Sequence, residues 1–208
     1  TTTKISTNMT TELIVAVETQ RRSNIGTIIR TASAFGASLV IVVGSSQFST
    51  HGAHGAQGHM PVFHFFYWEE CLQFLHQRGV NSVFGISPSI IAPVAGRPKT
   101  STSIEGYKHR FEGSACFIVS RIDRKMRGLT DEEMNLCKEI FHVSLPKGKE
   151  EDIIPNISKI AISLRAYAKS VDLSPSVYAA EKFALGERDC HKTKVIKSTV
   201  SMPGLRRL

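Results

Sequence analysis

The sequence has 208 residues, 41% of them hydrophobic and 21% charged, which is typical of one globular domain with a single core. No segment approaches the roughly 18 consecutive apolar residues of a membrane span, and no signal-peptide pattern opens the chain, so we expect neither a membrane nor a secreted protein. The formal net charge of +8 favours a polyanionic partner, with nucleic acid first.

Short apolar runs alternate with helical patterns along the chain. The runs predict strands buried on both faces at 13–17, 39–43, 83–86 and 116–119, with a weaker strand at 141–145. Helices are predicted at 24–35, at 68–78 before Gly79, at 131–140 behind a Thr130–Glu133 capping box, and after Pro155 with Asn156 as cap. This alternation predicts an α/β fold, a parallel sheet flanked by helices on both faces. Ligands bind at the carboxyl ends of such strands, so we expect the loops after 17, 119 and 145 to form the site.

The helix predicted at 24–35 has a polar start. Ser23 or Asn24 can cap it. Arg30 lies four residues after Gly26, and helical side chains lean toward the N-terminus, so we expect its guanidinium to pass over Gly26 and approach Asn24. Gly26 would then leave room for something to approach the helix, and the corner suits an anion or a developing oxyanion. A surface arginine beside an incidental glycine is the alternative.

Two segments do not follow the alternating pattern. Residues 49–65 are rich in glycine and histidine, and residues 87–114 are rich in proline, serine and threonine, which predicts a mobile loop with some local structure. We predict no metal site, because no zinc-ligand spacing is matched by the histidines of the first segment, His51, His54, His59 and His64. Contact of these histidines with RNA or a partner is favoured instead.

The end of the chain is basic. Between Gly186 and Leu208 there are six lysines and arginines against two acidic residues, without a clear apolar period. This composition predicts a flexible basic arm that binds nucleic acid, with a merely solubilising tail as the alternative.

Cysteine usage indicates the compartment. The four cysteines are scattered without CxxC spacing, which predicts reduced thiols and an intracellular location. The first residue is Thr1, which is compatible with loss of an organellar presequence. Mitochondria and cytoplasm are therefore both candidates.

The segment "RRSNIGTIIRTASAFG" resembles the first motif of the SpoU-type branch of SPOUT RNA methyltransferases, through Asn24, Gly26, Arg30 and Thr31. It follows an "LIVAVE" strand and precedes an "LVIVV" strand, as in that family. The segments 55–65, 128–146 and 155–164 resemble further parts of the family pattern. We therefore expect a SpoU-type methyltransferase-like domain over 1–170 and a C-terminal extension with a basic tail over 171–208.

This resemblance implies a SPOUT-type fold with a C-terminal trefoil knot, a homo- or heterodimer, and methyl transfer from S-adenosylmethionine to a ribose 2′-hydroxyl of rRNA or tRNA. It implies that Arg30 stabilises negative charge, that Asn24 orients Arg30 or the ribose, that Asn156 positions the substrate, and that Ser158 caps the last helix or assists. The implied cofactor-binding residues are Ser120, Gly128, Leu129, Leu145, Gly148, Ile154 and Ser158. The implied RNA-binding residues are Arg21, Arg22, Arg30, Arg121, Arg124, Lys125, Arg127, Lys192, Lys194 and Lys197.

The sequence departs from the family at its second and third motifs. Ser120 replaces a glycine, the following glutamate is absent unless Asp123 substitutes, and Ile154 replaces a serine. These departures predict weak binding of S-adenosylmethionine by the isolated protein. They leave open a catalytically silent paralogue, acting on ribosomal assembly intermediates or as one half of a heterodimer, and a basic scaffold unrelated to SPOUT.

Overall fold

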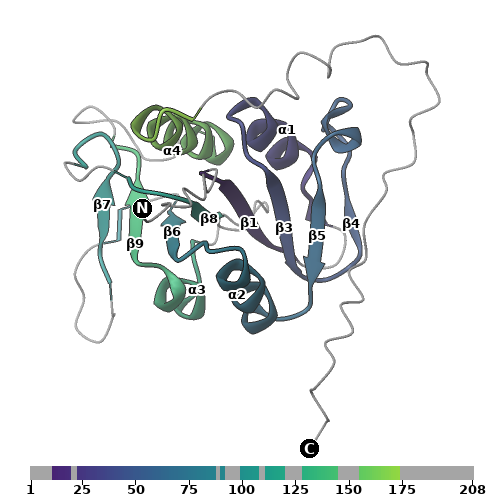
Figure 1. Ribbon diagram of the computed structural model, residues 1–208, viewed down its shortest axis with the longest axis horizontal. Coiled ribbons are helices and arrows are strands. Elements are labelled where there is room, and N and C mark those ends of the chain that lie inside the picture. The colour runs from purple at the N-terminus through teal and green to yellow at the C-terminus, as the bar shows by residue number, and fades with distance from the viewer. Residues whose placement is uncertain are drawn as a thin grey trace, which may run out of the picture.

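Seven parallel strands form one sheet in the order β5-β3-β1-β8-β6-β9-β7 (Figure 1). The computed structural model describes residues 11–19, 23–87, 90–91, 99–107, 111–119, 128–144 and 155–173. The strands are β1 (Leu13–Thr19), β3 (Leu39–Gly44), β5 (Val62–Phe65), β6 (Ser82–Ile86), β7 (Ser101–Ser103), β8 (Ala115–Val119) and β9 (Glu139–His142). A separate parallel pair joins β2 (Ser23–Asn24) to β4 (Phe48–Ser49).

Helices cover both faces of the sheet and make three layers (Figure 1). The helices α1 (Gly26–Ala34) and α4 (Asn156–Ser170) lie on one face, with the short 3₁₀ helix η1 (Ala56–Gly58) beside α1. The helices α2 (Trp68–Gln77) and α3 (Asp131–Leu136) lie on the other face. In the part of the chain that the structure describes, no helix is both long and apolar enough to cross a membrane.

The core has two halves, one on each face of the sheet. In β1, Leu13, Val15 and Val17 pack toward α1 and α4, whereas Ile14 and Ala16 pack toward α2 and α3. Because successive side chains of a strand point to opposite faces, a strand buried on both sides is apolar at every position. The α/β class with a parallel sheet flanked by helices is therefore confirmed. The predicted knot depends on segments 120–127 and 145–154, which lie outside the described residues, so it stays a prediction.

The predicted helix at 131–140 is too long. Its capping box is confirmed, since the Thr130 hydroxyl accepts from the Glu133 N–H and the Glu133 carboxylate accepts from the Thr130 N–H. The helix ends at Leu136, and the Lys138 N–H donates to the Val83 carbonyl at 2.6 Å, which starts β9 beside β6. The expected strand at 141–145 accordingly begins at Glu139 and ends at His142.

The start of α4 also differs from the prediction. Asn156 is the first residue of the helix, and Pro155 holds the cap position. The cap position predicted at Asn156 is therefore wrong by one residue, since Pro155 holds it. Proline has no backbone N–H, so its nitrogen needs no hydrogen-bond acceptor at the helix start. Its ring also fixes φ at a value that suits the start of a helix.

Tyr167 fixes α4 against the sheet. Its ring is fully buried, and its hydroxyl donates to the Gly113 carbonyl at 2.6 Å, with the Glu12 carbonyl at 3.3 Å. Gly113 precedes β8 and Glu12 precedes β1, so one hydroxyl joins the last helix to the starts of two central strands. Burial raises the pKa of Tyr167 to about 12, so the hydroxyl stays protonated and remains a donor.

Candidate functional site

The N-terminus of α1 is held by Asn24. The Asn24 Oδ1 atom accepts a hydrogen bond from the Gly26 N–H at 3.0 Å, and the Ile25 N–H donates to the Ser49 carbonyl at 2.8 Å. The first bond satisfies the exposed N–H of the first helical residue, and the second joins the start of the helix to β4. The predicted contact of Asn24 with the exposed N–H groups at the helix start is formed, but the cap position belongs to Ile25.

Gly26 makes room for the chain's own backbone rather than for a ligand. A Cβ atom at this position would lie 2.5 Å from the Thr50 carbonyl oxygen and closer still to the His51 carbonyl oxygen. No side chain fits at such a distance from a backbone atom. The room predicted at Gly26 is taken up by the segment after β4.

Arg30 stands exposed one turn further along α1. Among the residues that the structure describes, its guanidinium makes no hydrogen bond and no ion pair. The expected contact with Asn24 is not formed, since Asn24 Oδ1 bonds to the backbone of Gly26 instead. Arg30 is thus a cation without a partner among the described residues, on a helix whose start is fixed at two points.

The glycine- and histidine-rich segment forms two tight turns beside α1. The Ala53 N–H donates to the Thr50 carbonyl and the Ala56 N–H to the Ala53 carbonyl, and Ala53 itself is buried in the core. His54 takes a left-handed backbone conformation with φ 49° in the second turn. Within the described ranges, no group of three or more histidine, cysteine or acidic side chains could hold a metal ion. These turns pack the segment against Gly26 and leave the His51 and His54 side chains exposed.

Apolar side chains meet on the α4 face at the carboxyl ends of three neighbouring strands. Ile86 ends β6, Val119 ends β8 in register with it, and Val143 follows β9. All three belong to the same half of the core, and Ile157 from the first turn of α4 packs against it. Ile86, Val119 and Val143 are buried, so they form an apolar floor inside the core, beneath this edge of the sheet. An apolar floor is compatible with an adenine ring above it.

The implied cofactor residues that the structure describes do not all face that floor. The Leu129 side chain is buried in the opposite half of the core, where a Cβ on Gly85 would lie 2.6 Å from its Cδ1 atom. Gly128 is exposed, and Ser158 is half-buried on α4. Outside the described residues lie Ser120, Leu145, Gly148, Ile154, Arg21, Arg22, Arg121, Arg124, Lys125, Arg127, Lys192, Lys194 and Lys197, together with the side chain of Asn156.

Glu133 is a buried carboxylate whose burial was not predicted from the sequence. Its Oε2 atom accepts from the Thr130 N–H at 2.8 Å, whereas its buried Oε1 atom has no hydrogen-bond partner among the described residues. Burial, with a smaller contribution from the nearby Glu18 carboxylate, raises the pKa of Glu133 to about 7. Only the capping-box pattern marks this residue in the sequence, and that pattern predicts a helix start rather than a buried acid.

Residues 12–150 match the model of the SpoU rRNA Methylase family. The chain belongs to this family. The match spans the sheet and the helices α1, α2 and α3, including the corner formed by Asn24, Gly26 and Arg30. A comparison with curated proteins gives no match.

Solved structures share the fold at low sequence identity. An rRNA methyltransferase from Sinorhizobium meliloti with bound AdoMet (S-adenosylmethionine) is 20% identical, with a TM-score of 0.55 over 76% of this chain and 56% of that one. The SpoU methyltransferase AviRb from Streptomyces viridochromogenes, also with AdoMet, is 17% identical, with a TM-score of 0.57 over 77% and 60%. An RNA 2′-O ribose methyltransferase is 15% identical, with a TM-score of 0.55 over 77% and 56%. The chain thus spans 56–60% of the length of these structures.

Proposed function

We propose that this protein transfers a methyl group from S-adenosylmethionine to a ribose 2′-hydroxyl of RNA. The observation that carries the proposal is Arg30, an exposed guanidinium without a partner among the described residues, on a helix fixed by Asn24 and by the close contact at Gly26. Membership of the SpoU family and the fold shared with RNA methyltransferases support it.

Arg30 supplies the electrostatic part of this reaction. When bound, S-adenosylmethionine supplies an electrophilic methyl group. The ribose hydroxyl is a weak nucleophile, so it must be held about 3 Å from the methyl carbon and its developing negative charge must be stabilised. A guanidinium stays protonated at physiological pH and donates in a fixed planar fork. Arg30 therefore stabilises the oxyanion and contacts phosphate, and it does not act as a base.

The remaining site residues place Arg30, position the substrate or support the cofactor. Asn24 fixes the start of α1, so it places Arg30 through the helix rather than by direct contact. Asn156 positions the substrate at the N-terminus of α4, with Ser158 assisting from the first turn. In this proposal the buried side chains of Ile86, Val119 and Val143, with Ile157 packed against them, support the site from below. The residues of the second and third motifs complete the cofactor site in this proposal.

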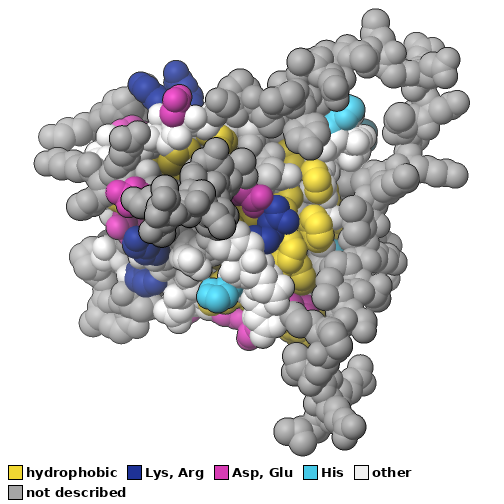
Figure 2. Space-filling view, viewed as in Figure 1, with side chains coloured by type: hydrophobic (Ala, Val, Ile, Leu, Met, Phe, Trp, Pro, Cys, Tyr) yellow, Lys and Arg dark blue, Asp and Glu magenta, His cyan; other side chains and the backbone are white. Residues whose placement is uncertain are grey.

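The substrate in this proposal is rRNA or tRNA, and the net charge of +8 provides the general attraction. On the face in Figure 2, the lysines and arginines that the structure describes lie in separate small groups rather than in one basic patch. We therefore assign much of the phosphate contact to Arg21, Arg22 and the basic tail. The site is expected to be shared across a homo- or heterodimer, as the family resemblance implies.

Cofactor affinity is expected to be weak for the isolated protein. Ser120 has a Cβ atom where the family has glycine, and the cations at 121–127 disfavour a positively charged sulfonium. Calorimetric titration of S-adenosylmethionine should give a dissociation constant of roughly 100 μM or weaker, which corresponds to about 5.5 kcal/mol at most. Binding in the low micromolar range would show that these departures do not impair the pocket.

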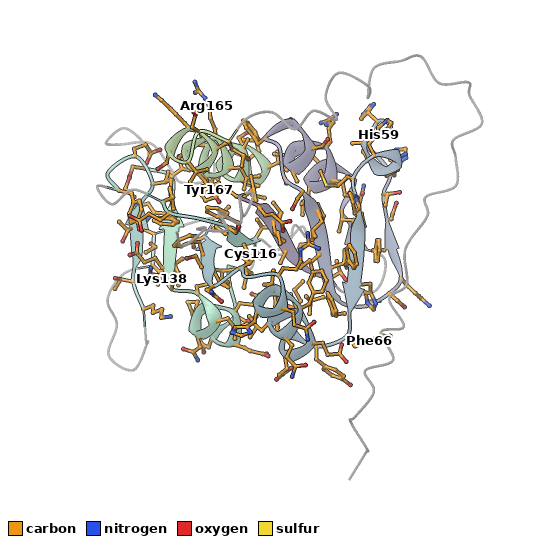
Figure 3. All side chains as sticks on the ribbon, viewed as in Figure 1. His59, Phe66, Cys116, Lys138, Arg165 and Tyr167 are labelled. Carbon is orange, nitrogen blue, oxygen red and sulfur yellow. The ribbon has the colours of Figure 1, made fainter. Side chains whose placement is uncertain are left out.

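Arg30 variants test the proposal. Arg30→Ala should lower methyl incorporation into RNA by about 100-fold or more, while RNA affinity stays nearly unchanged, because the missing charge acts mainly on the transition state. Lys138→Ala removes an exposed cation from the opposite side of the sheet (Figure 3) and should leave incorporation unchanged. Equal activity of the Arg30 variant and the wild type would overturn the role of Arg30.

A further inference from the structure

Two adjacent aromatic side chains stand exposed at the carboxyl end of β5. Phe66 is 61% exposed and Tyr67 is 67% exposed, whereas their neighbours Phe65 and Trp68 are 9% and 6% exposed. The buried neighbours anchor the pair on both sides, so the backbone between β5 and α2 presents the two rings in a fixed position. Figure 3 shows Phe66 at the edge of the molecule where β5 leads into α2.

A row of rings leads from the Asn24 corner to this pair. Asn24 pairs with Ser49 in the small sheet, and Phe48, the residue before Ser49, carries the first ring of the row. The centroids of Phe48 and His64 are 6.4 Å apart, and those of His64 and Phe66 are 4.7 Å apart in an edge-to-face arrangement. The His64 Nε2–H donates to the Gly44 carbonyl at 2.8 Å, which fixes the middle ring of the row.

We propose that Phe66 and Tyr67 form a stacking platform for unpaired bases of the RNA substrate, an inference that rests on the proposed function. Single-stranded RNA is recognised largely by stacking of splayed bases on aromatic side chains, and every base offers such a face. The protein is strongly basic overall, which suits an RNA strand as the occupant. The ring row connects this platform with β4, which pairs with β2 just before α1.

Local charge selects bases rather than phosphates at the platform. Glu69 and Glu70 are exposed in the first turn of α2, and the Glu70 carboxylate accepts from the Phe66 N–H at 3.1 Å. These carboxylates repel a phosphate but not the uncharged face of a base. The platform therefore contributes to affinity without contributing to its dependence on salt.

A second copy of the chain fits this surface less well. An aromatic side chain buries about 150–250 Å² when fully covered, so the pair offers about 500 Å² at most. A stable protein interface buries about 800 Å² on each partner. The exposed pair is thus large enough for two bases and too small to hold a dimer by itself.

The test compares aromatic and aliphatic side chains at the two positions. The full chain and its Phe66→Leu/Tyr67→Leu variant are titrated, by fluorescence anisotropy, into a fluorescein-labelled RNA strand of about 12 nucleotides and into its blunt duplex. The swap Phe66→Tyr/Tyr67→Phe is the matched control, since it keeps both rings. The emission of Trp68, the single tryptophan of the chain, confirms that each variant is folded.

We expect the leucine variant to bind the single strand at least about five-fold more weakly, with the slope of log K against log salt unchanged. The leucine variant should bind the duplex as tightly as the wild type does. The ring-swap control should bind both RNAs as tightly as the wild type does. Unchanged single-strand affinity, a reduced salt slope, or an effect on self-association alone would overturn the platform and leave the proposed function standing. Absence of RNA binding by the wild type would overturn both.

Discussion

Replacing Gly26 by alanine tests whether the start of α1 is fixed by the segment after β4. The added Cβ atom would lie 2.5 Å from the Thr50 carbonyl oxygen and closer still to that of His51. Both are backbone atoms, held by the Ile25–Ser49 hydrogen bond and by the turn that buries Ala53, so neither can swing aside. Either α1 or the 50–53 turn must move.

Whether Gly26→Ala stabilises or destabilises the protein shows whether the site at Gly26 is open or obstructed. At an unobstructed helical site, alanine is more stable than glycine by about 1 kcal/mol. Overpacking costs about 1–3 kcal/mol, and the upper part of that range applies against rigid backbone. We therefore expect Gly26→Ala to lose about 1–2 kcal/mol net, which lowers the melting temperature of a chain of this size by about 2–8 °C.

Urea unfolding followed by circular dichroism measures this change. Gly58→Ala is the matched control, because a Cβ atom at Gly58 meets nothing within 4 Å. That variant should be as stable as the wild type, or more stable by up to about 1 kcal/mol. If Gly26→Ala proved as stable as the control, the close approach of residues 50–51 would not constrain α1.

Three further predictions concern α4, α3 and the tail. Tyr167→Phe should lower the free energy of unfolding by about 1–2 kcal/mol, since the Gly113 and Glu12 carbonyls lose their donor, whereas Tyr67→Phe on the surface should have no effect in the same urea assay. The pKa of Glu133 is raised to about 7 in the folded protein, so its contribution to stability is fully present below the unfolded value and is lost as pH rises through about 7. Glu133→Gln should therefore remove up to about 3 kcal/mol of pH dependence between about pH 4.5 and 7, and a wild-type profile in the variant would contradict this assignment. Removing 186–208 should reduce the slope of log K against log salt for RNA binding, and an unchanged slope would show that the tail makes no phosphate contact.

The central strands and the first motif could be predicted from the sequence because their signals are local. β1, β3, β6 and β8 are buried on both faces, so each appears as an uninterrupted apolar run. The Asn24–Gly26 hydrogen bond and the Thr130–Glu133 capping box depend on residues two and three positions apart. Such patterns are complete within a few residues.

The edge strands and the reason for Gly26 could not be predicted, because they depend on contacts distant in sequence. β5 and β7 each have one neighbouring strand, and β7 consists of Ser101, Thr102 and Ser103, so neither shows a long apolar run. Gly26 is required by residues about 25 positions away, which no local pattern records. The boundary at Leu136 was missed for a similar reason, since pairing of β9 with β6 ends the helix.

The position of the methyl group in the RNA product tests the central proposal most directly. The purified protein is incubated with S-adenosylmethionine labelled in its methyl group and with separate rRNA and tRNA fractions, and the RNA is then hydrolysed in alkali. A 2′-O-methyl group removes the hydroxyl that alkali needs to cleave the adjacent phosphodiester. We predict label in alkali-resistant dinucleotides from one of the two fractions. Label in mononucleotides, or no incorporation into either fraction, would contradict transfer to the ribose 2′-hydroxyl.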